Sequence, residues 1–371
     1  MMADYDVVII GAGIAGASLA AEVAPHARVL VAEAEERPGY HSTGRSAAFW
    51  AESYGGPKVQ PLTTASGPWL HSPPGGYGDR SFLAPRGALT LARAGEEPLL
   101  DAFEAEFAGT GVRMERWGRD RIAALLPGLA EDIVAAVYEP DCQDIDVGGL
   151  HQAFLSVARR GGAQIALKAP LEHAEYRGGQ WHLVLGGQAV TATRLANAAG
   201  AWADPVATRC GVRPLGVQPY RRTVVQLRTR PAPVAHLPLT LGVRGDYYFK
   251  PEAGKLWLSP HDETPEDPGD TAPDEMDMAI AIDRFTQVVD WTIEAVEHRW
   301  AGQRSFAPDR LPVIGYAADN PAFFWFAGQG GFGIQTAPAA ARLAATVLLG
   351  LTPDAMLSGV AGQMYNPARF G

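Results

Sequence analysis

Hydrophobic residues near the start of the chain come in short runs that are separated by glycines and polar turns. Residues 7–10 form a β-branched run, which is typical of a strand buried on both faces. A G-x-G-x-x-G motif follows, and residues 14–24 have the apolar spacing of a helix. Residues 28–33 form a second apolar run that ends in an acid. This pattern predicts a strand, a tight turn, a helix and a second strand.

The rest of the chain continues to alternate between short strands and helices. Residues 194–202 again predict a strand, a tight turn and a helix, whereas residues 264–273, rich in Pro, Asp and Glu, predict a loop. Further strands are predicted at residues 83–91, 164–167, 171–176, 181–185 and 323–328, and further helices at 96–107, 147–160 and from the turn at 329–334 to about 349.

The three glycines of the first motif have distinct roles in a dinucleotide site. Gly11 allows the sharp turn, Gly13 allows the backbone to approach a pyrophosphate, and Gly16 allows the helix to pack closely on the strand. The helix N-terminus supplies unpaired N–H groups for the phosphates. Glu33 is placed to accept the hydroxyls of an adenosine ribose and would repel a 2′-phosphate. The motif therefore predicts FAD or NAD, not NADP; the alternative is that the glycines serve packing alone.

A second glycine-rich turn, at residues 329–334, separates a buried-strand pattern from a long Ala/Leu helix. NAD needs only one such helix start, so a second one suits a longer ligand such as FAD. Its positive end could hold negative charge at the pyrimidine side of a reduced flavin. No other G-x-G-x-x-G follows a strand pattern, which predicts that the substrate itself donates the electrons. The alternative is an ordinary core helix after a turn.

The composition limits the possible partners. The chain has 371 residues, 47% hydrophobic and 19% charged, as in a globular enzyme of one large or two ordinary domains. A net charge of −10 gives no indication of a nucleic acid or an anionic membrane as partner. Cys142 and Cys210 have no metal-ligand spacing, so no metal is predicted. No apolar run is long enough for a transmembrane segment, and we expect a cytoplasmic protein.

Residues 38–48 form a small, polar, glycine-broken segment soon after the second strand. Ser42, Thr43 and Ser46 are favourable helix caps, and Arg45 is placed to meet a phosphate or the edge of a flavin. An ordinary capped loop explains the same residues equally well.

Several motifs in combination resemble the D-amino acid oxidase superfamily of flavoproteins, and most closely its bacterial D-arginine dehydrogenases. They lie at residues 11–16 with Glu33, 39–48, 197–202, 212–216, 248–251, 300–305 and 328–335, so the resemblance covers nearly the whole chain. It implies an α/β fold with a discontinuous, Rossmann-like FAD-binding domain built on a parallel sheet. An α+β substrate-binding domain on a mixed or antiparallel sheet is inserted in it. The implied FAD-binding domain comprises residues 1–85, 145–215 and 300–371, and the substrate-binding domain residues 86–144 and 216–299.

The resemblance also implies that FAD is bound noncovalently. No cysteine lies in the C-terminal part, where the sarcosine oxidase branch tethers its flavin. The implied cofactor contacts are Gly11, Gly13, Ile14, Ala15, Gly16, Glu33, Ala34, Ser42, Thr43, Arg45, Ser46, Ala47, Ala48, Ala199, Gly200, Trp202, Gly302, Arg304, Gly330, Gly331, Gly333, Ile334, Gln335 and Thr336.

Oxidation of an α-amino acid requires that the carboxylate is clamped and that the Cα–H is aimed at flavin N5. By resemblance, Arg222 and Arg304 are the candidates for the clamp, since planar guanidinium groups bind carboxylates bidentately. Tyr248 and Tyr54 match positions whose hydroxyls contact the substrate carboxylate or cover the pocket. Without the resemblance, structural ion pairs and core tyrosines would be the simpler interpretation.

Two departures from the D-arginine dehydrogenases concern the substrate pocket, which Gln335 is also expected to line. Ala88 stands where those enzymes have an acid for the substrate guanidinium, and Phe49 stands where they have a histidine. Both changes make the pocket less polar. His41 and His151 lie in the wider motifs, where a lone histidine is more often structural than catalytic. We therefore expect an FAD-dependent D-amino acid dehydrogenase or oxidase that favours apolar over basic substrates.

The same motifs leave other functions open. A clamp and a flavin would also serve a sarcosine-like secondary amine or a 2-hydroxy acid oxidoreductase. A protein of another class would be a non-catalytic flavin-binding scaffold, although paired guanidinium groups have no physical purpose there. The electron acceptor is expected to be O₂ or a quinone.

Overall fold

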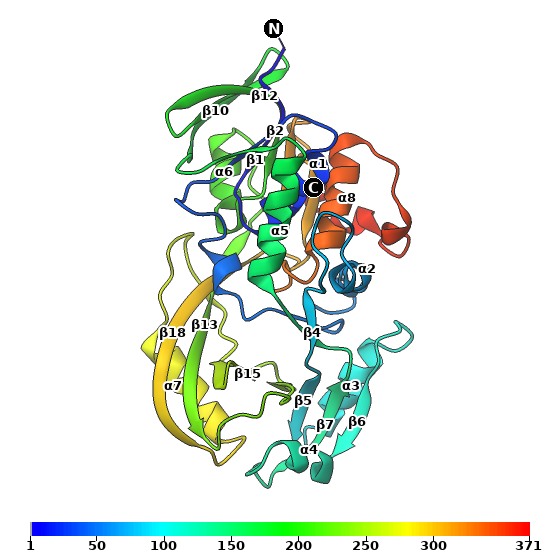
Figure 1. Ribbon diagram of the computed structural model, residues 1–371, viewed down its shortest axis with the longest axis vertical. Coiled ribbons are helices and arrows are strands. Elements are labelled where there is room, and N and C mark those ends of the chain that lie inside the picture. The colour runs from blue at the N-terminus through cyan, green and yellow to red at the C-terminus, as the bar shows by residue number, and fades with distance from the viewer. Residues whose placement is uncertain (1) are drawn as a thin grey trace.

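The computed structural model describes residues 2–371 and places a largely parallel sheet in the upper part of the molecule (Figure 1). Its strands are β1 (Tyr5–Ile10), β2 (Val29–Ala32), β9 (Gln164–Ala166), β10 (Leu171–Arg177), β11 (Gln180–Leu185), β12 (Gln188–Asn197), β19 (Val313–Tyr316) and β20 (Phe323–Ala327). The pairs β1–β12, β1–β2, β2–β9 and β12–β20 are parallel. β10, β11 and β12 form an antiparallel meander, and β19 runs antiparallel to β20.

Helices cover both faces of this sheet, which explains the β-branched run in β1. Val7 and Ile9 share a core with helices α1 (Ile14–Val23), α5 (Val147–Arg160) and α8 (Ala337–Leu349). Val8 and Ile10 share a second core with α6 (Ala203–Arg209) on the opposite face. Successive side chains of a strand point to opposite faces, so each of the buried residues 7–10 of β1 had to be apolar. Helix α2 (Gln60–His71) packs against α8.

The lower part of the molecule is built on a mixed sheet (Figure 1). Its strands are β5 (Ala88–Arg93), β6 (Glu115–Gly118), β7 (Ile133–Glu139), β13 (Gln218–Arg230), β14 (Leu239–Gly242), β15 (Tyr248–Glu252), β16 (Lys255–Ser259), β17 (Thr264–Pro265) and β18 (Thr292–Phe306). Only the pair β14–β5 is parallel among the described pairs of this sheet. Helices α3 (Glu97–Glu106), α4 (Arg119–Leu125) and α7 (Glu275–Thr286) pack on it.

A small third sheet of β3 (Phe49–Trp50), β4 (Leu83–Pro85) and β8 (Gln143–Ile145) lies between the two large ones. It corrects one prediction, because residues 83–91 are not a single strand. β4 and β5 belong to different sheets and are separated by Gly87, whose φ of +73° makes the turn. The predicted loop at 264–273 contains the short strand β17, which pairs with β13.

The predicted fold class, a Rossmann-like α/β unit with a second unit on a mixed sheet, is confirmed. The domain boundaries stay a prediction, and β18 runs without interruption across the boundary expected at residue 300. Short 3₁₀ turns complete the chain: η1 (Ser42–Arg45), η2 (Gly200–Trp202), η3 (Ala355–Leu357), η4 (Gly362–Tyr365) and η5 (Pro367–Phe370). Within residues 2–371, no helix combines the length and apolarity needed to cross a membrane, and no His, Cys, Asp and Glu side chains cluster as a metal site.

Candidate active site

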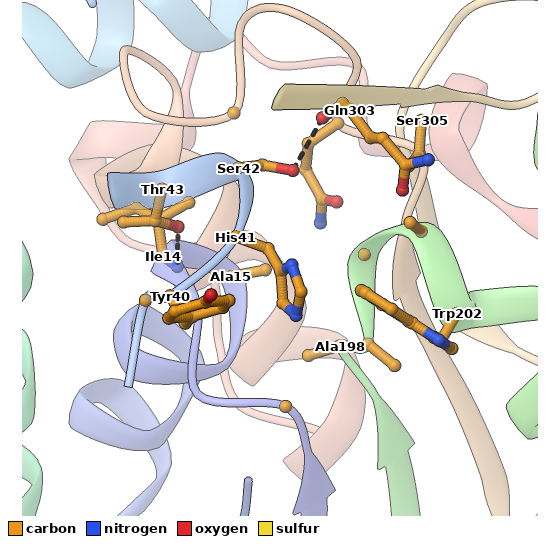
Figure 2. A pocket seen from close by; sticks show the side chains of 18 of the residues that line it. Ile14, Ala15, Tyr40, His41, Ser42, Thr43, Ala198, Trp202, Gln303 and Ser305 are labelled. Atoms are coloured by element: carbon orange, nitrogen blue, oxygen red, sulfur yellow. Dashed lines mark hydrogen bonds between the residues drawn. The ribbon is translucent and has the colours of Figure 1, made fainter. Parts of the chain in front are cut away.

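A cavity of about 490 Å³ lies where α1, η1, η2 and β18 meet (Figure 2). Its wall combines both glycine-rich turns, although more than three hundred residues separate them in the sequence. The predicted cofactor contacts in this wall are Gly11, Gly13, Ile14, Ala15, Glu33, Ala34, Ser42, Thr43, Arg45, Ser46, Ala199, Gly200, Trp202, Gly302, Arg304, Gly330, Gly331, Gly333 and Ile334.

The turn from β1 into α1 has room for glycine only. Gly11 has a φ of +99°, and a Cβ there would lie 2.6 Å from the carbonyl oxygen of Ala198. A Cβ on Gly16 would lie 1.8 Å from the carbonyl oxygen of Gly11, so this glycine packs the helix on the turn and does not line the cavity. Gly13 is the N-cap of α1, whose first turn has no acidic residue. The helix start therefore presents its positive dipole end to the cavity without an acidic residue of its own, which fits an anionic pyrophosphate.

The hydroxyls of the 38–48 segment connect neighbouring elements. Thr43 Oγ1 accepts a hydrogen bond from the Ile14 N–H at 2.9 Å, and Ser42 Oγ donates to the Gln303 carbonyl at 2.6 Å (Figure 2). Thr43, predicted as a favourable helix cap, therefore bonds to the first residue of α1. The segment itself forms only the 3₁₀ turn η1, which has no side-chain cap. The partner of Thr43 lies on α1 and that of Ser42 on β18.

Glu33 lies at the end of β2, as predicted, and its carboxylate is almost completely buried. Its oxygens accept the N–H of Ala12 at 2.7 Å and that of Glu35 at 3.0 Å. A neighbour for which the sequence favoured a structural role is His41, whose Nε2 lies 2.9 Å from Glu35 and whose Nδ1 is buried without a partner. Its ring faces Trp202, with 4.6 Å between centroids (Figure 2). The motif at 39–48 contained His41, but only tertiary contacts show that it lines the cavity.

Some of the predicted cofactor contacts lie outside the cavity wall or are bonded to other residues of the chain. Arg45 lines the cavity, yet its guanidinium forms an ion pair with Asp270 on the opposite loop. Ala47 lies in an apolar cluster away from the cavity wall, and Ala48 packs against the core around α1. Thr336 donates its hydroxyl to the Phe332 carbonyl at 2.9 Å and is fully buried, so its side chain is not available to a ligand.

The two candidate clamp arginines are neighbours on one sheet face. In the antiparallel pair β13–β18, Arg222 lies opposite Gly302, and Tyr220 lies opposite Arg304. Residues two apart on a strand, and residues directly opposite each other, share a face of the sheet. Arg222 and Arg304 therefore lie diagonally on the same face of the sheet, and both line the cavity.

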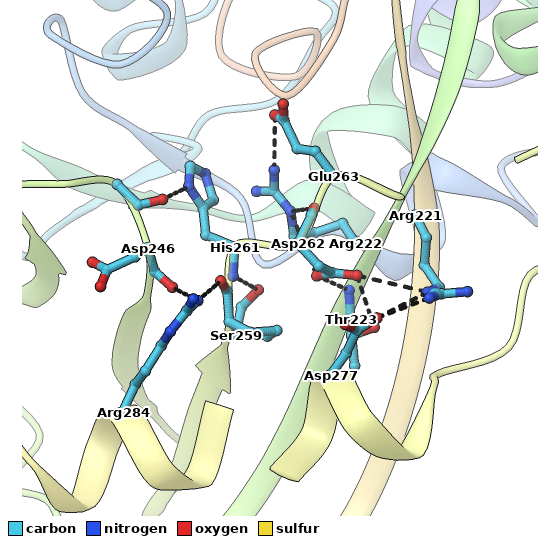
Figure 3. Close-up of polar contacts among 12 residues, drawn as sticks. Arg221, Arg222, Thr223, Asp246, Ser259, His261, Asp262, Glu263, Asp277 and Arg284 are labelled. Carbon is cyan, nitrogen blue, oxygen red and sulfur yellow. Dashed lines mark hydrogen bonds and ion pairs between the residues drawn. The ribbon is translucent and has the colours of Figure 1, made fainter. Parts of the chain in front are cut away.

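One edge of the Arg222 guanidinium is hydrogen-bonded, and the other edge has no partner. It is 3% exposed; its Nε donates to the Asp262 carbonyl at 2.8 Å and its Nη2 to Glu263 at 3.2 Å (Figure 3). Nη1 is buried with no partner. Burial and the neighbouring cation Arg304 lower the pKa of Arg222. Glu263 also pairs with Arg310, whose Nη2 lies 2.7 Å from Glu263 Oε1. The Arg304 guanidinium has no hydrogen bond or ion pair within residues 2–371.

Two tyrosine hydroxyls converge on these guanidinium groups. The Tyr248 hydroxyl is buried and has no partner. A Cβ added to Gly331 would lie 2.6 Å from the Tyr54 hydroxyl and 2.9 Å from Arg304 Nε, so these groups meet at the second glycine-rich turn. The Phe49 ring lies against both tyrosines, with centroids 5.0 Å from Tyr54 and 6.4 Å from Tyr248. The structure therefore gathers hydrogen-bond donors that lack an acceptor.

Gln335 holds the segment that carries Tyr54. Its amide oxygen accepts the Ala51 N–H at 3.1 Å, and its amide nitrogen donates to the Tyr54 carbonyl at 2.9 Å. Glu139 supports the same segment by accepting the Glu52 N–H at 2.7 Å, and burial raises the pKa of this carboxyl to about 7. A contact of Gln335 with flavin or substrate, by side chain or backbone, stays a prediction. The amide is only 2% exposed and serves to position Tyr54.

Phe49 and Ala88 lie in one apolar cluster with Tyr248, Cys142 and neighbouring side chains. Both are buried, and Ala88 pairs with Glu139 across β5 and β7. The Glu139 carboxylate is engaged by the 52–53 backbone and by Ser53 Oγ. The surroundings of these two positions are therefore apolar. Neither residue is part of the cavity wall, and their place in a substrate pocket stays a prediction.

The fold and this site define a dinucleotide-binding oxidoreductase. The family model for FAD dependent oxidoreductases, DAO, matches residues 6–347, and the chain belongs to this family. The predicted superfamily and the predicted cofactor, FAD, are thereby confirmed. The closer resemblance to D-arginine dehydrogenases stays a prediction.

The individual proteins that resemble this chain share only low sequence identity with it. The bifunctional protein ThiO/ThiG of Synechocystis sp. is 26% identical over 100% of this chain, which spans only 55% of that protein's length. Glycine oxidase of Pseudomonas aeruginosa is 26% identical over 94% of this chain and 95% of its own. The crystal structure of L-proline dehydrogenase from P. horikoshii superposes with a TM-score of 0.85 at 20% identity, covering 100% of this chain and 98% of that one.

Replacing Glu33 by Ala should weaken FAD binding by about 1–3 kcal/mol, because a ribose hydroxyl would lose its acceptor. Fluorescence titration of apoprotein with FAD measures the effect. Glu36→Ala is the matched control, since the Glu36 side chain follows on the same loop and is 72% exposed. Equal FAD affinity in the two variants would remove Glu33 from the cofactor site.

Proposed function

We propose that this chain oxidises amino acids by FAD-dependent deamination and favours D-amino acids with apolar side chains. A hydride leaves Cα and a proton leaves the amine, which gives the imino acid; water then converts it to the 2-oxo acid and ammonia. FAD, when bound, supplies the hydride acceptor. O₂ or a quinone would then reoxidise the cofactor. The observation that carries this proposal is a set of donors without an acceptor: Arg222 Nη1 and Arg304, which line the cavity, and the neighbouring hydroxyls of Tyr54 and Tyr248.

A carboxylate is the ligand that these donors fit best. Buried cationic groups are costly unless they are paired, and guanidinium groups bind carboxylates through two parallel N–H bonds. The contacts of Arg222 with Asp262 and Glu263 occupy the side of its guanidinium that carries Nε, which leaves Nη1 for a ligand. A carboxylate between Arg222 and Arg304 would also be within the reach of Tyr54 and Tyr248. Clamping it limits the ways in which Cα can be presented to the cofactor.

The side-chain preference rests on the apolar surroundings of Phe49 and Ala88. A guanidinium or ammonium group next to Phe49 and Ala88 would lose water without gaining a carboxylate. Two acids of the loop after β16 could otherwise have paired with a basic substrate side chain. Glu263 is engaged with Arg222 and Arg310, and Glu266 is engaged with Arg221. The D configuration is supported by the resemblance alone.

Glycine or a sarcosine-like secondary amine is the second candidate. It is supported by the close contacts of Phe49 with Tyr54 and Tyr248, which limit the room for a side chain. The similarity to a glycine oxidase over most of both chains supports it too. A 2-hydroxy acid would satisfy the same clamp. A scaffold without turnover is disfavoured, because paired guanidinium groups are costly to bury without a ligand.

Replacing Arg304 by Ala should lower kcat/KM by about 100-fold or more, about 3 kcal/mol, because the carboxylate loses a bidentate partner. Arg304→Lys should rescue poorly, since an ammonium keeps the charge without the fork. Arg228→Ala is the control, because this arginine lies on β13 with a side chain that is 53% exposed. If steady-state rates of Arg304→Ala equal those of Arg228→Ala, the substrate carboxylate is not held here.

On a panel of amino acids, D-Leu, D-Met and D-Phe should exceed D-Arg and D-Lys in kcat/KM by at least about tenfold, since burying a large apolar group contributes roughly 1.5–3 kcal/mol. Initial rates of 2-oxo acid formation decide the order. The L-enantiomers, glycine and sarcosine belong on the same panel. D-Arg as the best substrate would contradict the role given to Ala88, and glycine or sarcosine as the best would favour the second candidate.

A further inference from the structure

His261 follows β16 in a short loop that leads to Asp262 and Glu263. Its backbone has a φ of +56°, a left-handed conformation that is uncommon for a residue with a side chain. Its Nδ1 bonds to the carbonyl oxygen of Gly245, and its Nε2 has no hydrogen-bond partner within residues 2–371. Figure 3 shows the ring on the same side of β13 as the Arg222 guanidinium. Such backbone outliers concentrate at functional sites.

The ring lies among the groups that form the proposed carboxylate clamp. Its centroid is 5.7 Å from that of Tyr248 and 6.5 Å from that of Tyr54. Burial, followed by the positive charges of Arg222, Arg304 and Arg310, lowers the pKa of His261 to about 3. The imidazole is therefore neutral at physiological pH. Since Nδ1 must carry the proton that it donates to the Gly245 carbonyl, Nε2 presents a lone pair and acts as an acceptor.

A site for an amino acid needs an acceptor in addition to these donors. The guanidinium groups and the tyrosine hydroxyls supply donors for a carboxylate, but an amino acid also brings N–H groups that need acceptors. The nearby carboxylates already have partners. Glu263 accepts from Arg222 and from Arg310, and Asp262 accepts from the Thr223 N–H at 2.7 Å and from Thr223 Oγ1 at 3.0 Å. Unlike these carboxylates, His261 Nε2 has no partner, and unlike the tyrosine hydroxyls it can act only as an acceptor.

We infer that Nε2 of His261 accepts a hydrogen bond from the amino group of the substrate while the arginines hold its carboxylate. The inference rests on the proposed function and deepens it, because it names the group that recognises the amine. Two substituents of Cα would then be fixed by the protein. Fixing the amine in addition to the carboxylate is what a site needs to distinguish the two faces of Cα.

The test compares two ligands that differ only in the amine. 2-Aminoisobutyrate has an amino group and a carboxylate but no Cα–H, so it cannot be oxidised, and it is achiral; isobutyrate lacks the amine. Dissociation constants for the FAD-loaded protein follow from the change in flavin absorbance on titration. In His261→Asn, the affinity for 2-aminoisobutyrate should fall about tenfold, the value of one hydrogen bond, while that for isobutyrate stays within about twofold.

His261→Asn is chosen because asparagine tolerates the left-handed backbone and its amide can still donate to Gly245. His298→Asn, at an exposed position of β18, is the control and should change neither constant. Equal weakening for both ligands would mean that His261 only supports the loop, and no change for either would mean that a backbone carbonyl receives the amine. Both results overturn the inference. Failure of the proposed function is distinguishable, because then Arg304→Ala would also leave the binding of both ligands unchanged.

Discussion

The arrangement of the site depends on two guanidinium groups that share one face of the β13–β18 strand pair and are only partly paired with carboxylates. Arg222 is buried and contacts one backbone carbonyl and two carboxylates, Glu263 and the more distant Asp262, each of which has other partners. Arg304 has no ion pair within the described chain. Buried charge of one sign is unfavourable unless something compensates it. These two positive charges lie at the cavity that fits FAD, where the carboxylate of a substrate would pair with both of them.

The two long strands explain how one site can serve both parts of the molecule. β18 reaches from the mixed sheet to η1 and η2, so Gly302 and Arg304 line the cofactor cavity. Antiparallel pairing then carries Arg222 to the same place from a segment about eighty residues earlier in the chain. The second glycine-rich turn provides the remaining contact, because Gly331 leaves space for Tyr54 and Arg304 to approach.

Local patterns predicted the cofactor side of the site and not the substrate side. The G-x-G-x-x-G spacing, Glu33 and the turn at 329–334 predicted FAD because each reports a backbone constraint that glycine or an acid must meet locally. Arg222, Arg304 and the tyrosines needed the family resemblance, since nothing local shows that strands so far apart would pair. Thr43, Gln335 and His261 have partners on distant elements, so no pattern could predict their contacts. The predicted strand at 83–91 failed because the turn at Gly87 interrupts an otherwise continuous β-like run.

The central claim is that a ligand held by its carboxylate reduces the flavin. Anaerobic mixing of the FAD-loaded protein with D-leucine, and separately with 3-methylbutylamine, tests it most directly, because the amine is D-leucine without its carboxylate. The account predicts rapid loss of the oxidised flavin absorbance with D-leucine and little change with the amine over the same time. Equally fast reduction by the amine would contradict it, since the arginine pair would then have no part in holding the substrate.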